Sequence, residues 1–366
     1  MRPTIRLGRV AGVEVGIHWS LLVIGAVLVG SLATGEFPAL TPHAHGSYLA
    51  AAVIAVAFFF GSILAHELAH SIVARRQGQT VNGITLWLLG GVSELGSEPK
   101  NAGDELRVAI AGPATSIALG VIFGGLALLL DAVLPAGGLL PTVTLWLAVV
   151  NLLLGVFNLL PGAPLDGGRV LAALHWKFKG DRRNAQIAAA RAGRVVGTIL
   201  VVGSLALLFT GTDAILSGLV GLFVLSASRH EESSARMLRA LDGRVVGELM
   251  RPISHIAPEW TSVADFGPMA EPTLVAGWDG TPTALLPPGA VFAVPPEARA
   301  HVQLRALSLP LVQYPHVRID APAVEVMTNG LPAIVDDADG RPVGVFGLDE
   351  LKIAARRDPV LARSAR

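Results

Sequence analysis

Gly61-Ser-Ile-Leu-Ala-His66-Glu67-Leu-Ala-His70 lies within an apolar segment that is long enough to cross a membrane. Residues four positions apart share one face of a helix, so the imidazoles of His66 and His70 can reach the same metal ion. Glu67 lies beside them, where its carboxylate can take a proton from metal-bound water. Two histidines that pack between helices are the alternative, but ionisable groups inside a membrane are costly and typically mark functional sites. We therefore interpret this turn as part of a metal site.

The overall composition is that of a membrane protein. The chain has 366 residues, of which 52% are hydrophobic and 15% are charged, and its mean hydropathy is +0.58. Soluble domains carry about 25% charged residues, which argues against an ordinary soluble enzyme. The 28 basic and 28 acidic side chains balance, which argues against a nucleic-acid-binding protein that relies on positive charge. The chain contains no cysteine, so thiolate metal sites and cysteine nucleophiles are excluded.

Apolar segments recur through residues 1–228, whereas residues 229–366 have the composition of a soluble domain. We predict a polytopic α-helical membrane protein with about six transmembrane helices. The expected spans are residues 18–35, 48–74, 107–130, 141–160, 195–210 and 213–228. A crossing helix needs about 20 apolar residues, so the last two spans are short. Those two could instead form a helical hairpin that only dips into the bilayer.

The basic residues of this apolar half identify its cytoplasmic side. Its 14 Lys and Arg residues fall in three groups, Arg2–Arg9, Arg75–Arg107 and Arg169–Arg194. Cytoplasmic loops of membrane proteins carry such an excess of positive charge. We therefore expect a multi-pass protein of the inner (plasma) membrane with its N- and C-termini in the cytoplasm. An even number of crossings would return the chain to the side on which it began, in agreement with the charges.

A catalytic zinc centre needs a third protein ligand, because its fourth position is left for water. Without cysteine, the donor must be His, Asp or Glu. Asp166 is the outstanding candidate, in the sequence Asn158-Leu-Leu-Pro161-Gly-Ala-Pro164-Leu-Asp166-Gly167-Gly168-Arg169. Prolines and glycines break the fourth span here, and broken helices at membrane depth occur where they are buried or line a cavity. A helix kink with a capping aspartate is the alternative.

Together, the two motifs resemble those of the site-2 proteases, which are intramembrane zinc metalloproteases with HExxH in one core helix and NxxPxxxxDG in another. The resemblance extends over most of residues 1–228. It implies one zinc ion per chain, bound by the two histidines and Asp166, with Glu67 as the catalytic acid/base. It also suggests Asn158 as a polar group near the reacting carbonyl. An inter-helix hydrogen bond is the alternative role for Asn158.

The residues are also consistent with a hydrolytic mechanism. Zinc activates its bound water and polarises the scissile carbonyl, while Glu67 can accept the proton of the water and pass it to the leaving amine. Asn158 can donate a hydrogen bond to the oxyanion. Residues 80–94 (TVNGITLWLLGGVSE) are rich in β-formers and predict a hairpin whose edge pairs with an unwound substrate; a plain loop is the alternative. Ala111-Gly-Pro-Ala-Thr-Ser116 supplies small residues, for which we expect a helix-packing role.

The C-terminal residues resemble CBS (cystathionine β-synthase) domains. Val246-Gly-Glu-Leu-Met250-Arg-Pro252 is similar to the start of such a domain, and residues 331–351 hold two apolar runs around an Asp-Ala-Asp-Gly turn that favours a hairpin. We predict a linker or short helix over 229–246, followed by a degenerate α/β CBS-like cytoplasmic domain over 247–366, whose first repeat is poorly formed. Gly347 stands where the family usually has threonine, which leaves the binding of an adenosine nucleotide open. A homodimer through this tail is a further expectation.

The sequence therefore predicts an intramembrane zinc metalloprotease that cleaves in or near the transmembrane segment of single-span membrane proteins within the lipid bilayer. Resemblance to bacterial members of the family suggests an anti-sigma factor or a similar signalling protein as the substrate. A CBS-regulated membrane ion transporter is the alternative. Such a transporter would share the spans and the tail, but it would need paired charges along a pathway, whereas the acids here cluster with two histidines.

Overall fold

The computed structural model describes residues 3–41, 45–88, 90–134, 138–210, 214–324, 326 and 332–357. The chain divides into two compact units, Met1–Glu232 and Ser233–Arg366. The first unit contains the long apolar helices, and the second contains two small β-sheets.

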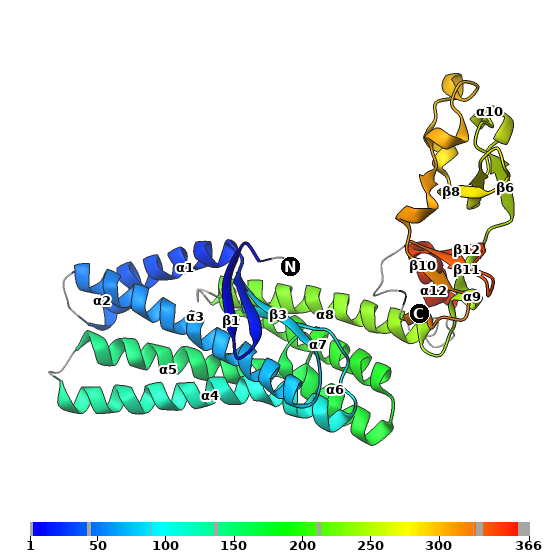
Figure 1. Ribbon diagram of the computed structural model, residues 1–366. Helices are drawn as coiled ribbons and strands as arrows, with labels where there is room; N and C mark the ends of the chain where they lie inside the picture. Colours follow the sequence, from blue (N-terminus) through cyan, green and yellow to red (C-terminus); the bar gives the residue numbers. More distant parts are fainter. Residues whose placement is uncertain are drawn as a thin grey trace. The chain divides into compact units, whose positions relative to one another are not determined.

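The first unit is a bundle of long helices, several of which lie side by side (Figure 1). Within the described residues, five stretches are long and apolar enough to cross a membrane: Ser20–Leu40, Tyr48–Arg76, Ala102–Val133, Leu139–Asn158 and Arg182–Phe209. They correspond to α1 (Ser20–Ser31) with the π-helix η1 (Leu32–Glu36) and α2 (Phe37–Leu40), α3 (His45–Arg76), α4 (Ala102–Val133), α5 (Leu139–Asn158) and α7 (Arg182–Phe209). Large apolar side chains such as Leu128 and Phe209 are exposed on these helices, as expected for a surface that faces lipid.

Five of the about six expected crossings are found in the described part of the chain. The fifth span is longer than predicted, because α7 already begins at Arg182. The last predicted span is the start of α8 (Ile215–Leu241), and its apolar part ends before Arg229, short of the about 20 residues that a crossing needs. α8 then continues to Leu241 through most of the stretch predicted as a linker.

A four-stranded sheet packs on the helices near the C-terminal half of α3. It consists of β1 (Ile5–Val10), β2 (Val13–Ile17), β3 (Val81–Trp87) and β4 (Gly90–Leu95), in that order, with β2 parallel to β3. The predicted hairpin is confirmed as the antiparallel pair β3–β4. The N-terminal hairpin was not predicted, although its turn at Ala11 and Gly12, with φ of 51° and 78°, is of the kind that joins two strands. Buried Ile84 belongs to a hydrophobic cluster against which Leu64 and Leu68 of α3 pack.

The break between α5 and the amphipathic helix α6 (Asp166–Lys179) is a compact loop over residues 159–165. A Cβ on Gly167 would overlap the carbonyl oxygen of Leu159, and one on Gly168 would overlap the backbone nitrogen of Ala163. The loop therefore folds back onto the first turn of α6, and glycine is required at both positions. This close approach brings Asp166 into the interior of the helix bundle.

The second unit contains two four-stranded sheets with the same connectivity, β6-β7-β8-β9 and β10-β11-β12-β5. In each sheet the first two strands are parallel, the second and third form a hairpin, and the fourth pairs with the third. The strands are β5 (Arg251–Pro252), β6 (His255–Pro258), β7 (Thr273–Ala276), β8 (Pro282–Leu286), β9 (Leu309–Pro310), β10 (His316–Arg318), β11 (Ala333–Asp336) and β12 (Pro342–Phe346). The helices are α9 (Val246–Leu249), α10 (Val263–Phe266) and α12 (Leu348–Arg357), with short 3-10 turns at Ala290–Ala293, Pro296–Ala298, Leu304–Ala306 and Leu311–Gln313.

The first repeat, which was expected to be poorly formed, has a sheet with the same strand order as the second. After its hairpin it has the short 3-10 turns Ala290–Ala293 and Pro296–Ala298, where the second repeat has α12. The two repeats exchange strands: β5 precedes the first repeat but pairs with β12, and β9 precedes the second repeat but pairs with β8. Buried apolar residues of both sheets then form one shared core, made of Leu274, Leu285, Ile334 and Val345. The hairpin turns also match, since Trp278-Asp-Gly-Thr-Pro282 corresponds to Ala338-Asp-Gly-Arg-Pro342.

Candidate metal centre

Three side chains from two distant segments converge inside the first unit. The Nε2 atoms of His66 and His70 lie 3.2 Å apart. The Oδ2 atom of Asp166 lies 3.1 Å from the Nε2 of His66 and 3.2 Å from that of His70. The two imidazoles come from successive turns of α3, and Asp166 is the first residue of α6. In the part of the chain that the structure describes, this is the group of His, Asp and Glu residues that could hold a metal ion.

The other ring nitrogen of each histidine has a fixed partner on α4. The Nδ1 of His70 donates a hydrogen bond to the carbonyl oxygen of Val108 at 2.7 Å, which leaves its Nε2 lone pair free for a metal in the neutral ring. The Nδ1 of His66 lies 2.9 Å from the hydroxyl of Ser116. Partners of this kind fix the orientation of metal-binding imidazoles. Sequence analysis did not identify the contact of Ser116 with His66, because it predicted only helix packing for the segment 111–116.

Gly112 gives the two imidazoles their space. A Cβ at this position would lie 2.6 Å from the Nε2 of His66 and would overlap the Nε2 of His70. The helix α4 thus approaches the ring edges so closely that any side chain here would occupy the region between the ligand atoms. The segment 111–116 therefore packs, as predicted, against another helix, and the residues it packs against are the two histidines of the metal centre.

The chemistry of these groups fits zinc. Two imidazole nitrogens and one carboxylate oxygen form the His/His/carboxylate set of catalytic zinc sites, in which a water takes the fourth position. The histidines are buried, with 4% of His66 and 5% of His70 exposed. Buried nitrogen lone pairs and a carboxylate that all face one another need a cation or protons between them. Because Gly112 has no side chain, it leaves room beside the ligand atoms of His66 and His70.

A cavity of about 560 Å³ opens onto these three side chains, and both Glu67 and Asn158 line it. The strand β4 passes directly beside the acid, because a Cβ on Gly91 would overlap the Cγ of Glu67. Asn158 is the last residue of α5, and its Nδ2 donates a hydrogen bond to the carbonyl oxygen of Leu154 at 3.0 Å. A side-chain amide carries two hydrogens, so this bond leaves one for a ligand in the cavity. The structure therefore brings all five predicted site residues to one cavity.

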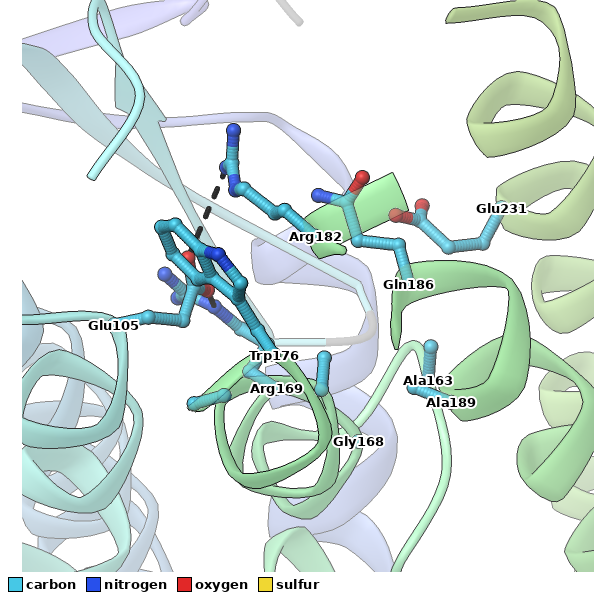
Figure 2. A pocket seen from close by; sticks show the side chains of 11 residues that line it. Glu105, Ala163, Gly168, Arg169, Trp176, Arg182, Gln186, Ala189 and Glu231 are labelled. Atoms are coloured by element: carbon cyan, nitrogen blue, oxygen red, sulfur yellow. Dashed lines mark hydrogen bonds and ion pairs between the residues drawn. The ribbon is translucent and has the colours of Figure 1, made fainter. Parts of the chain in front are cut away.

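On its other side, α6 is tied to its neighbours by ion pairs (Figure 2). The Nε of Arg169, one turn after Asp166, donates to Glu105 of α4 at 3.1 Å. Glu105 also lies 3.8 Å from Arg182 of α7, whose guanidinium is 5.4 Å from the ring centroid of Trp176. These contacts border a second, smaller cavity of about 130 Å³. They hold the helix that carries Asp166 to both α4 and α7.

Known proteins are similar to this chain over most of its length. The family model of peptidase family M50 matches residues 54–137 and 132–204. Rip3 of Mycobacterium tuberculosis, named as a zinc metalloprotease, is 41% identical over 347 residues, which cover 91% of this chain and 86% of Rip3. The solved site-2 protease from Methanocaldococcus jannaschii is 31% identical and covers 62% of this chain and 94% of that one, with a TM-score of 0.44. A solved CBS domain of a bacterial CNNM/CorC family Mg²⁺ transporter covers 37% of this chain and 93% of that one, at 14% identity and a TM-score of 0.26.

The 41% identity to Rip3 extends over 91% of the chain, and so includes both the helix bundle and most of the C-terminal unit. Of the two functions predicted from the sequence, this relationship supports the zinc metalloprotease and not the CBS-regulated ion transporter. Zinc is the cofactor that this relationship implies, and the buried His/His/Asp group provides a place for it. The chain belongs to peptidase family M50 and is a multi-pass membrane zinc metalloprotease of the site-2 protease type.

Proposed function

We propose that this protein hydrolyses peptide bonds in or near the transmembrane segment of single-span membrane proteins. In this proposal His66, His70 and Asp166 hold one zinc ion, and Glu67 is the general base. The observation that carries it is the convergence of the three ligand atoms in a cavity that Glu67 also lines, among helices long and apolar enough to span a membrane. A hydrolytic site inside hydrocarbon needs such a cavity, because water is its nucleophile.

The chain's own residues divide the catalytic work. Bound zinc would supply Lewis acidity toward the scissile carbonyl and toward water. Glu67 takes the proton of the attacking water and returns it to the amine as the peptide bond breaks. The remaining amide hydrogen of Asn158 donates to the oxygen on which negative charge develops. Each of these two residues borders the cavity, so each can contact a bound peptide.

The edge strand β4 offers the substrate a place to bind in extended form. A carbonyl within a helix is already hydrogen-bonded, so the substrate has to unwind before attack. β4 is the last strand of its sheet, and its Gly91 lies against Glu67. A peptide that adds to this edge by backbone hydrogen bonds would pass beside the catalytic carboxylate. This geometry supports strand addition as the mode of substrate binding.

The orientation and the remaining partners belong to the same proposal. Arg75 and Arg76 end α3 shortly after His70, and Arg169 follows Asp166, so both parts of the site lie toward the positively charged side. This supports a site near the cytoplasmic face of an inner (plasma) membrane. Both termini in the cytoplasm stay a prediction, which requires the apolar start of α8 to return the chain across the membrane after the five longer spans. An anti-sigma factor is the kind of single-span substrate we expect. A CBS-like regulatory tail within 247–366 and its homodimer contact stay predictions, and the binding of an adenosine nucleotide to this tail stays open.

The decisive experiment compares the wild type with Glu67→Gln on a membrane-embedded model substrate in proteoliposomes. We expect cleavage to fall by about 10²–10⁴-fold, because proton transfer is lost, while about one zinc per chain is retained. Glu36→Gln is the matched control, since Glu36 is exposed on η1 and lies outside the cavity lining. Equal cleavage by wild type and Glu67→Gln would end the proposed mechanism.

A further inference from the structure

Helix α8 contacts the loop that precedes Asp166 through a buried hydroxyl. The Oγ of Ser228 lies 2.6 Å from the carbonyl oxygen of Ala163, which belongs to the loop over residues 159–165. Ser228 is fully buried, at 0% exposure. Its Oγ also lies 2.6 Å from the carbonyl oxygen of Val224 on its own helix. A serine hydroxyl carries one proton, so the two carbonyl oxygens share this donor.

The same loop is also hydrogen-bonded to the backbone of α7. The backbone nitrogen of Ala163 donates to the carbonyl oxygen of Ala189 at 3.1 Å, and the two alanines lie side by side in Figure 2. A Cβ on Gly193 would lie 2.6 Å from the Oγ of Ser228 and would overlap the carbonyl oxygen of Ala163. The backbones of the loop and α7 thus approach each other closely, with Ser228 of α8 against both. A shift of α8 would therefore have to move the loop backbone, because no flexible side chain lies between them.

One turn beyond Ser228, a buried carboxylate locks α8 to α7. Glu232 has 4% of its surface exposed, and its Oε1 and Oε2 pair with Arg191 at 3.2 Å and Arg194 at 3.1 Å. These two arginines flank Gly193 in the same turn of α7. A buried carboxylate with two arginine partners resists separation strongly, because breaking the pairs would leave its charge uncompensated. The contact of Ser228 with the loop is therefore held in place from both helices.

We propose that Ser228 is a positioning residue for the zinc ligand Asp166. By holding the carbonyl of Ala163, Ser228 fixes the loop from which α6 begins, and thereby fixes the carboxylate that faces His66 and His70. The inference rests on the proposed function, in which Asp166 binds zinc.

The test measures zinc binding and geometry in the full chain in detergent, comparing Ser228→Ala with the wild type. We expect the zinc dissociation constant, from competition with a chelator, to rise about 10–100-fold, as for other residues that orient metal ligands. The d–d absorption of the cobalt-substituted protein should shift, and kcat should fall while KM stays unchanged. Ser228→Thr keeps the hydroxyl and should restore most of the affinity. Ser62→Ala is the matched control, since buried Ser62 donates to the carbonyl oxygen of Phe58 on its own helix.

Zinc affinity and a cobalt spectrum equal to those of Ser62→Ala would overturn the proposal. If Ser228→Ala does not fold, Glu232→Gln decides instead: it keeps the shape of the side chain while weakening both ion pairs. It should raise the zinc dissociation constant in the same direction, and an unchanged value would contradict the proposal. Asp166→Asn separates the two hypotheses. Normal zinc content in that variant refutes the proposed ligand, whereas its loss together with normal binding in Ser228→Ala refutes only the positioning role.

Discussion

The metal centre and the beginning of α12 both gather charged or polar groups, but they satisfy them differently. At the metal centre, two imidazole nitrogens and the Oδ2 of Asp166 face one another. At α12, the Oε2 of Glu350 accepts a hydrogen bond from the backbone nitrogen of Gly347 at 3.0 Å, and its Oε1 pairs with Arg251 at 2.9 Å. In the first cluster the atoms that meet are all possible metal ligands, whereas in the second the chain supplies donors to the acid. A convergence of acceptors thus indicates a ligand, and a matched set of donors and acceptors indicates stability.

The largest expected effect comes from filling the space between the metal ligands. We expect Gly112→Ala to lose bound zinc and, with it, peptide cleavage, because the new Cβ would overlap the Nε2 of His70. Zinc content by atomic absorption and cleavage of a membrane-embedded substrate check this. Gly125→Ala is the matched control on the same helix, since a Cβ on Gly125 meets no atom within 4 Å. Normal zinc content in Gly112→Ala would show that the three side chains do not bind the ion at this place.

A smaller effect is expected from Asn158, whose role concerns the reaction and not the metal. Asn158→Ala should lower kcat by about 10²-fold with zinc content unchanged, as for the loss of one donor to an oxyanion. Single-turnover cleavage and thermal unfolding distinguish this from a structural role. If Asn158 only joins helices, the variant would lower the unfolding temperature and leave kcat unaltered.

Sequence alone pointed to the three side chains that the structure brings together, because each of the two motifs can be recognised within its own short segment. The i, i+4 spacing places both histidines on one helix face, and the absence of cysteine leaves Asp166 as the outstanding third donor of the apolar half. Ser116 was missed because its role depends on which face of α4 meets α3, and small residues along a helix do not encode that choice. The helix packing that sets this face is a property of the whole bundle.

The tail shows the same limit for the fold. The second repeat was recognised from its hairpin, whereas the first was recognised only from its start at residues 246–252. The strands β5 and β9 are two residues long and pair with the other repeat. Strands this short carry no alternating pattern, so periodicity cannot identify them. The matching turns at Gly280 and Gly340, both at φ 77°, are the signal that would have revealed the repeat.

The smallest effect is expected from a substitution of Glu350, which pairs with Gly347 and Arg251 at the beginning of α12. Glu350→Gln should lower the free energy of local unfolding by about 1–3 kcal/mol, because Arg251 loses its charged partner and the amide of Gly347 keeps only a neutral acceptor. Hydrogen exchange of the Gly347 amide and of β12 in the full chain measures this, and zinc content should not change. Arg318→Gln is the control, since its partner Asp320 is a surface carboxylate.

The same measurement on the wild type decides whether this cluster leaves room for an anion. A nucleotide phosphate at the start of α12 would have to displace the carboxylate of Glu350 from both of its partners, so we expect saturating ATP to leave the exchange of the Gly347 amide unchanged. Slower exchange with ATP in the wild type would contradict this expectation. It would also show that the metal centre and the Glu350 cluster do not differ in this respect, because groups that are hydrogen-bonded within the chain would then bind a ligand as well.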